Sequence, residues 1–146
     1  MPGEAVSINV YARVRGSSDE VVTPADKPGA LLCRNLEFSL DAAFDSEASQ
    51  KDCFDSVEAG SQAVARVLQG FNSTVLAYGQ TGSGKTFTMM GPEEADFGNP
   101  EAPELGLVPR ACGQIFSNLP AGFSVKVSYL EIYNDRVNDL LGQKDD

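Results

Sequence analysis

The sequence predicts an α/β domain, and three patterns along the chain support this prediction. Apolar residues alternate over Ala5–Val14, which is typical of a β-strand. A short apolar run at Ser73–Tyr78 precedes a glycine-rich turn, and a helical pattern begins directly after it, at Gly84–Met90. A strand, a glycine turn and a helix in that order, with a further helix before them, indicate the α/β class.

The first half of the chain is predicted to contain two strands and a long helix. The segment 16–29 is rich in Gly, Pro, Ser and Asp and is expected to form an exposed loop. A second strand is expected near Leu36–Leu40. Apolar residues then recur at helical spacing over Ser49–Leu68, with Ser49 as the predicted N-cap and Gly70 just past the end.

The second half is predicted to contain an acidic loop, a helix and a strand. Five carboxylates fall between Pro92 and Leu105 without a basic residue, which indicates an exposed loop. Gly106–Leu119 is predicted to be a helix. Pro109 is compatible with it because this residue would lie in the first turn, where proline is tolerated. Ser124–Tyr133 reads as a strand in an outer position of a sheet, since neither of its faces is wholly apolar.

Composition excludes several classes of function. The formal net charge of −10 over 146 residues disfavours binding to nucleic acid. No apolar run approaches the roughly 18 residues of a membrane span, and the N-terminus lacks the pattern of a signal peptide, so we expect a cytoplasmic protein without membrane contact. The chain has no histidine, which excludes histidine bases and most zinc sites, and its 3 cysteines are expected to be reduced.

The glycine turn is a phosphate-binding loop by its motif. Gly79–Thr86, with the sequence GQTGSGKT, fits G-x-x-x-x-G-K-[ST], the loop of P-loop nucleoside triphosphatases. Glycines let successive backbone N–H groups face a phosphate chain. Lys85 is expected to contact the β- and γ-phosphates, and the Thr86 hydroxyl is expected to ligate Mg²⁺. These two residues are therefore the predicted catalytic pair, and Thr86 the predicted metal ligand.

The residues around this loop resemble one family, the kinesin motor domain. The resemblance lies in LAYGQTGSGKTFTMMG and in four further blocks: LEFSLDAAFDSEASQKDCFDSV, GFNSTVLAYG, GLVPRACGQIF and VSYLEIYNDRVNDLL. It implies a P-loop NTPase fold with a central mixed β-sheet flanked by helices. It also implies that residues 1–146 are the N-terminal, incomplete part of such a motor domain.

The same resemblance implies a binding site for ATP and Mg²⁺. Phe87 matches the position that flanks the adenine, and Arg13 and Arg15 match the arginines of the family's R-x-R-P adenine-contact motif, although Gly16 replaces the proline. The phosphate-binding residues it implies are Gly79, Gln80, Thr81, Gly82, Ser83, Gly84, Lys85 and Thr86.

The family's two switch motifs, N-x-x-S-S-R and D-L-A-G-S-E, do not occur in the sequence. Because these switches sense the γ-phosphate, the chain alone is expected to be inactive, as one part of an ATP hydrolase that moves along microtubules. Microtubule binding, dimerisation through a stalk and cytoskeletal location would depend on elements outside it.

The alternatives are a stand-alone P-loop nucleotide-binding or regulatory protein and an unrelated small kinase or GTPase. The lack of N-K-x-D argues against a GTPase.

Overall fold

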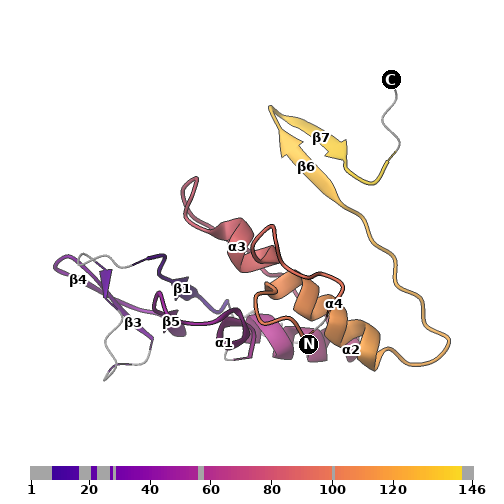
Figure 1. Ribbon diagram of the computed structural model, residues 1–146, viewed down its shortest axis with the longest axis horizontal. Helices are drawn as coiled ribbons and strands as arrows, with labels where there is room; N and C mark the ends of the chain where they lie inside the picture. The colour runs from indigo at the N-terminus through magenta and orange to yellow at the C-terminus, as the bar shows by residue number, and fades with distance from the viewer. Residues whose placement is uncertain are drawn as a thin grey trace, which may run out of the picture.

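The computed structural model describes residues 8–16, 21–22, 27, 29–55, 58–99 and 101–142. Its strands and helices are grouped along the chain, with the N-terminal strands beside a cluster of helices and a C-terminal hairpin beyond them (Figure 1). The strands are β1 (Tyr11–Arg13), β2 (Val21–Val22), β3 (Ala30–Cys33), β4 (Leu36–Ser39), β5 (Ala42–Phe44), β6 (Leu130–Tyr133) and β7 (Arg136–Asp139). The helices are α1 (Gln50–Asp55), α2 (Ala63–Leu68), α3 (Lys85–Met90) and α4 (Leu107–Asn118).

The α/β class is confirmed, but the described strands form three separate sheets instead of one central sheet. β1 pairs in parallel with β5, β2, β3 and β4 form an antiparallel sheet, and β6 pairs with β7 as an antiparallel hairpin. The expectation of one central mixed sheet is therefore wrong for the described residues. A strand needs a neighbour to satisfy its backbone groups, and periodicity does not say which segment that neighbour is.

The predicted N-terminal strand is shorter than the alternation indicates. Residues 1–7 lie outside the described residues, and Ile8 and Val10 precede β1 with 80% and 50% of their surface exposed. The Val10 amide donates to the Asp41 carboxylate at 2.7 Å, which ties this end of the chain to the start of β5. The strand expected near Leu36 is confirmed as β4, whereas β3 and β5 were missed and β2 lies where only a loop was expected.

The helix predicted over Ser49–Leu68 is broken in the middle. A π-helical turn, Glu58–Gln62, separates α1 from α2, and Gly60 in it has non-helical angles, φ −99° and ψ −107°. A Cβ atom at Gly60 would overlap the Phe54 carbonyl, so this close approach requires glycine. The predicted ends are confirmed by geometry. Gly70 has φ +94°, and its amide donates to the Val67 carbonyl at 2.9 Å.

The N-terminus of α1 is fixed by a reciprocal capping interaction. The Asp52 amide donates to the Ser49 hydroxyl oxygen at 3.1 Å, and the Ser49 amide donates to the Asp52 carboxylate at 2.9 Å. The Ser49 hydroxyl also donates to that carboxylate at 2.7 Å. This hydroxyl, followed by the backbone amide, holds the pKa of Asp52 below its usual value of 3.8. The predicted N-cap at Ser49 is therefore confirmed.

Helices α3 and α4 form where the sequence places them, but the strand predicted before them does not form and the strand predicted after them forms only in part. Gly84 caps α3, and Pro109 lies in the first turn of α4. Ser73–Tyr78 has no strand pairing, and Leu76 and Tyr78 are 84% and 96% exposed. Of the strand predicted over Ser124–Tyr133, only β6 forms. The prediction for Ser73–Tyr78 is wrong, and that for Ser124–Tyr133 is right only for its last four residues. An apolar or alternating pattern marks a possible sheet position without providing the adjoining strand.

The acidic loop between α3 and α4 is anchored by apolar residues and by one arginine. Ala95, Ala102 and Leu105 are buried together, while the carboxylates between them face outward or are half-buried. Arg110 in α4 donates from Nε to the Leu105 carbonyl at 2.8 Å and from Nη2 to the Ala102 carbonyl at 3.2 Å. The expectation of exposed charges holds, and the loop also has a small core of its own.

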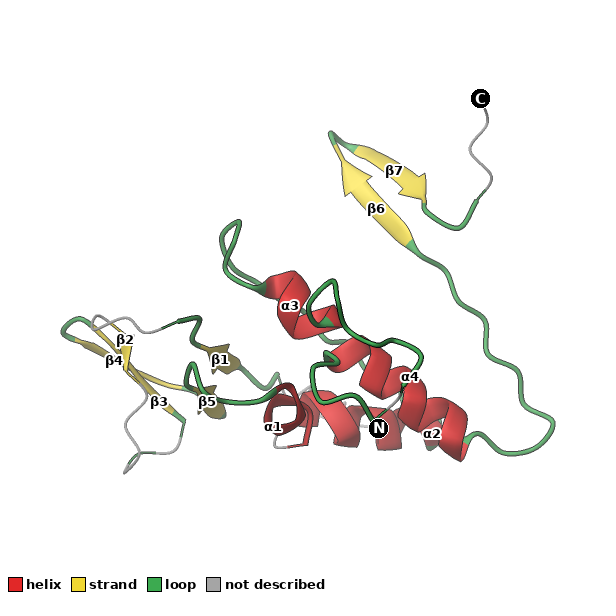
Figure 2. Ribbon diagram, viewed as in Figure 1, coloured by secondary structure: helices red, strands yellow, loops and turns green. Residues whose placement is uncertain are grey.

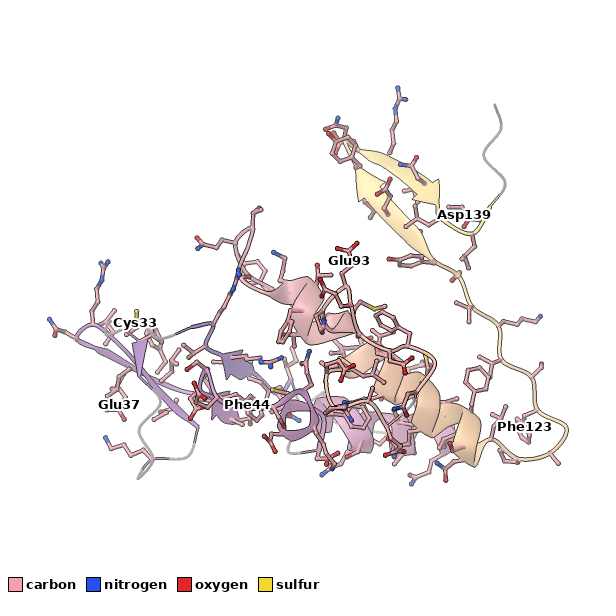
Figure 3. The ribbon with its side chains drawn as sticks, viewed as in Figure 1. Cys33, Glu37, Phe44, Glu93, Phe123 and Asp139 are labelled. Carbon is pink, nitrogen blue, oxygen red and sulfur yellow. The ribbon has the colours of Figure 1, made fainter. Side chains whose placement is uncertain are left out.

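The C-terminal hairpin stands apart from the helices, at the end of an extended segment that follows α4 (Figure 1). Asn134 and Asp135 form its turn with φ +49° and +58°, the left-handed pair typical of a type I′ turn. Figure 3 shows Phe123 on the extended segment just beyond α4, and Asp139 on β7, away from the helices. Every residue of β6 and β7 is exposed. None of the helices in the described part of the chain is long and apolar enough to cross a membrane.

Candidate nucleotide-binding site

The phosphate loop, Gly79–Thr86, projects beyond the N-terminal end of α3 as a curled turn (Figure 2). Gly82 and Gly84 have φ +79° and +98°, values that side chains with a Cβ rarely adopt. A Cβ at Gly79 would lie 2.5 Å from the Ser83 hydroxyl, which would then have to rotate away. The backbone therefore has the tight curl that a bound phosphate chain requires.

Lys85 folds back over the start of the loop. Its Nζ donates to the Gly79 carbonyl at 2.8 Å and to the Gln80 carbonyl at 2.9 Å. These neutral acceptors hold a positive charge above the loop, in the region that a polyphosphate would enter. An anion there would exchange two carbonyl contacts for stronger charge-assisted ones.

A cavity of about 520 Å³ lies between the loop and the end of β1. Its walls are formed by two segments that are far apart in sequence, together with Ser46. The lining residues are Arg13, Val14, Arg15, Gly16, Ser46, Gly82, Ser83, Gly84, Lys85, Thr86, Phe87 and Thr88. This volume suits a small-molecule ligand of nucleotide size.

Both predicted arginines contact the segment from Gly82 to Phe87, which forms one wall of this cavity. Arg15 donates from Nη1 to the Gly82 carbonyl. The Arg13 guanidinium lies over the Phe87 ring, with 5.1 Å from its carbon to the ring centroid, which is within the range of a cation–π contact. The two arginines and Lys85 give the cavity a positive character, although the chain as a whole is acidic.

The structure brings most of the predicted site residues together and leaves three at the edge. Arg13, Arg15 and the residues from Gly82 to Phe87 line one cavity. Gly79, Gln80 and Thr81 build the opposite side of the loop and do not line it. Gly16 does line it, with φ +70°, a value that proline cannot adopt. The backbone here therefore differs from that of a chain with R-x-R-P.

Sequence reasoning missed one residue of this neighbourhood, Gln50. Its side chain is 4% exposed and bridges Arg13 and the backbone of Phe87. The available signal was its place four residues before Phe54, on the apolar face of the helix, where a glutamine must be buried with partners.

The donor set fits a nucleotide polyphosphate better than a metal held by the protein alone. In the described part of the chain, no three His, Cys, Asp or Glu side chains converge to hold a metal. Thr86 is exposed and lines the cavity, so its hydroxyl is available to one face of a hydrated divalent ion. Mg²⁺ prefers this arrangement, with few protein ligands and the remaining oxygens from phosphates and water.

A family model for the kinesin motor domain matches residues 12–146. The chain belongs to the kinesin motor domain family. This confirms the resemblance and the P-loop NTPase fold inferred from it. Among curated kinesins, the chain is 38% identical over 166 aligned residues to kinesin-like protein KIN-5C of Arabidopsis thaliana, covering 97% of this chain and 16% of that protein. It is 46% identical over 114 residues to kinesin-related protein 5 of Dictyostelium discoideum, covering 73% of this chain and 11% of the relative.

Solved kinesin structures agree with this assignment. The Drosophila kinesin family member Kin10/NOD, in complex with divalent manganese and ADP, aligns with a TM-score of 0.74 and 32% identity. The alignment covers 95% of this chain and 50% of the NOD chain. A second structure has Drosophila NOD and bovine tubulin docked into a map of nucleotide-free NOD complexed to the microtubule. Its NOD chain aligns with a TM-score of 0.71 and 33% identity. The chain therefore spans about half of a kinesin motor structure.

Cys53 and Cys112 should differ in reactivity. Cys53 is buried, and burial raises the pKa of its thiol above the usual 9.0, an effect opposed by the nearby charge of Arg13. Cys112 in α4 is exposed. We expect a maleimide at pH 7.5 to label Cys112 at least about tenfold faster than Cys53, because the thiolate is the reacting form and must be accessible. Equal rates by peptide mass spectrometry would contradict the burial of Cys53.

Proposed function

We propose that this chain is the ATP-binding portion of a kinesin-like motor that couples ATP hydrolysis to movement along microtubules. The observation that supports this most is the cavity between β1 and the phosphate loop, which places Arg13, Lys85 and Phe87 around a space of about 520 Å³. Family membership and the nucleotide in the NOD structure support the same assignment.

In this proposal, each side of the cavity binds a different part of ATP. Backbone N–H groups of Gly82, Ser83 and Gly84 receive the phosphates, and Lys85 leaves its carbonyl partners for the β- and γ-phosphate oxygens. The adenine lies against Phe87. Arg13 and Arg15 form the rest of the base side, and Gly79, Gln80 and Thr81 maintain the curl of the loop.

The Thr86 hydroxyl would ligate Mg²⁺, which neutralises charge on the β- and γ-phosphates when it is bound. Lys85 and Thr86 are thus the catalytic contribution proposed for this chain. Orientation of the attacking water is assigned to switch residues, and neither switch motif occurs in these 146 residues. A polypeptide of residues 1–146 should therefore lack microtubule-stimulated hydrolysis.

The partners proposed follow from the family. Tubulin would be bound through elements outside this chain, as would a second copy in a dimer, and the location would be cytoplasmic and cytoskeletal. No nucleic acid or membrane contact is proposed. The net charge of −10 supports the lack of nucleic-acid and membrane contact, because an acidic segment is repelled by nucleic acids and by anionic lipids.

One experiment on the natural protein tests the proposal. An antibody raised against the Pro92–Leu105 peptide is used to isolate the protein from source cells, and its size and ATPase rate are measured with and without microtubules. We expect a band far above 15.5 kDa and a rate that rises at least about tenfold with microtubules. A single band near 15.5 kDa without stimulation would favour a stand-alone P-loop protein and would overturn the motor assignment.

A further inference from the structure

Gln50 is a buried amide where α1 meets β1 and α3, the two elements that contribute residues to the cavity wall. It is the first residue of α1, and 4% of its surface is exposed. Arg13 Nη1, from β1, donates to its Oε1 at 2.6 Å. Its Nε2 donates to the carbonyl of Phe87, in α3, at 2.6 Å. A buried amide that bonds to two elements fixes their separation, because breaking either bond leaves a polar group unpaired.

The chemistry of the two partners determines which way the amide faces. A guanidinium can only donate, so the atom that faces Arg13 must be the amide oxygen. A backbone carbonyl can only accept, so the atom that faces Phe87 must be the amide nitrogen. Gln50 therefore links β1 to α3 in a single orientation, and a side chain without both functions cannot replace it.

The two ends of this link are the residues that form the base side of the cavity. The Arg13 guanidinium lies over the Phe87 ring, and both residues line the cavity, whereas Gln50 does not. Arg13 is held further by the Thr88 hydroxyl at 3.2 Å and by the Ala48 carbonyl at 3.3 Å. All of these acceptors are neutral, so they fix the direction of the guanidinium without neutralising it.

We propose that Gln50 is a positioning residue that holds Arg13 and Phe87 in the arrangement that receives the nucleotide base. It thereby sets how strongly the site prefers a nucleotide to a bare polyphosphate. This inference rests on the proposed nucleotide-binding function. The site then has two parts: a phosphate side, formed by the loop itself, and a base side, whose geometry depends on α1.

The test compares two ligands on the natural full-length protein after nucleotide removal. Affinities for ATP and for inorganic tripolyphosphate, each with Mg²⁺, are measured by calorimetry for the wild type and for Gln50→Leu, which keeps the size and removes both hydrogen bonds. We expect ATP to bind roughly tenfold more weakly and tripolyphosphate to change by less than about twofold, because only the base side is altered. Gln62→Leu is the matched control, since Gln62 is exposed and makes no helix-cap hydrogen bond.

A second variant keeps the inference testable if Gln50→Leu does not fold. Gln50→Glu still accepts from Arg13 but cannot donate to the Phe87 carbonyl, so we expect a loss of roughly threefold to tenfold confined to ATP. An unchanged ratio of ATP to tripolyphosphate affinity, or an equal loss of both, would overturn the positioning role. A wild-type protein that binds neither ligand would instead overturn the proposed function, and the role of Gln50 with it.

Discussion

Replacement of Lys85 by alanine is expected to weaken ATP binding by the natural full-length protein about 100-fold. Lys85 Nζ donates to the Gly79 and Gln80 carbonyls at 2.8 and 2.9 Å. In the proposed complex with ATP, these contacts would give way to charge-assisted contacts with phosphate oxygens, each of about 1.5–3 kcal/mol. Removing the ammonium thus removes the main cation on the phosphate side. Equilibrium titration with ATP measures the effect.

The control for this prediction is Lys126→Ala. Lys126 is exposed on the segment between α4 and β6, so the substitution makes the same change in net charge at a remote place. We expect the affinity of this variant for ATP to stay within about twofold of wild type, since screened charges beyond a Debye length of about 10 Å interact weakly. Unchanged affinity in Lys85→Ala would refute the role of this lysine and leave the cavity without its phosphate contact.

Replacement of Gly106 by alanine is expected to lower stability by about 2–3 kcal/mol, the upper part of the range for an overpacked site. Gly106 caps α4 with φ −78° and ψ −170°, angles that alanine adopts readily. The difficulty is contact. A Cβ there would lie 2.6 Å from the Met89 carbonyl carbon and 2.6 Å from the Met90 nitrogen, and backbone atoms of a helix cannot move aside individually.

Thermal unfolding measures this effect, with an expected decrease of roughly 5–10 °C in the melting temperature of the domain. Gly98→Ala is the control. A Cβ at Gly98 would meet only the Asp96 carboxylate, at 3.2 Å, and this side chain can rotate away. Melting of the Gly106 variant within about 1 °C of wild type would contradict the close approach of the end of α3 to the start of α4.

The Gly106 contact also bears on the site. Its amide donates to the Met90 carbonyl at 3.0 Å, which ties the C-terminal end of α3 to α4. The phosphate loop continues directly into α3, so loosening of this junction should reach Lys85 and Phe87 through six helical residues. We therefore expect the Gly106 variant to lose some ATP affinity as well, but less than Lys85→Ala does.

The phosphate loop, the caps of the helices and the family could all be read from the sequence. The loop is eight consecutive residues, and its glycines, Lys85 and Thr86 act through bonds and charges that a short stretch of backbone arranges by itself. The same holds for Ser49, which bonds to Asp52 three residues later, and for Gly70 at the end of α2. Interactions this local form in the same way whatever the rest of the chain does.

The pairing of strands and the base side of the cavity were decided by the tertiary structure. The apolar run Ser73–Tyr78 indicated a strand, yet no described strand pairs with it, because pairing depends on which distant segment approaches. The bond between Arg13 and Gln50 joins residues 37 positions apart, and no periodicity specifies it. The sequence by itself determined the phosphate chemistry, since local backbone geometry is enough for it. Only the fold decided what surrounds Arg13 and Phe87, because these contacts form where β1, α1 and α3 meet in space.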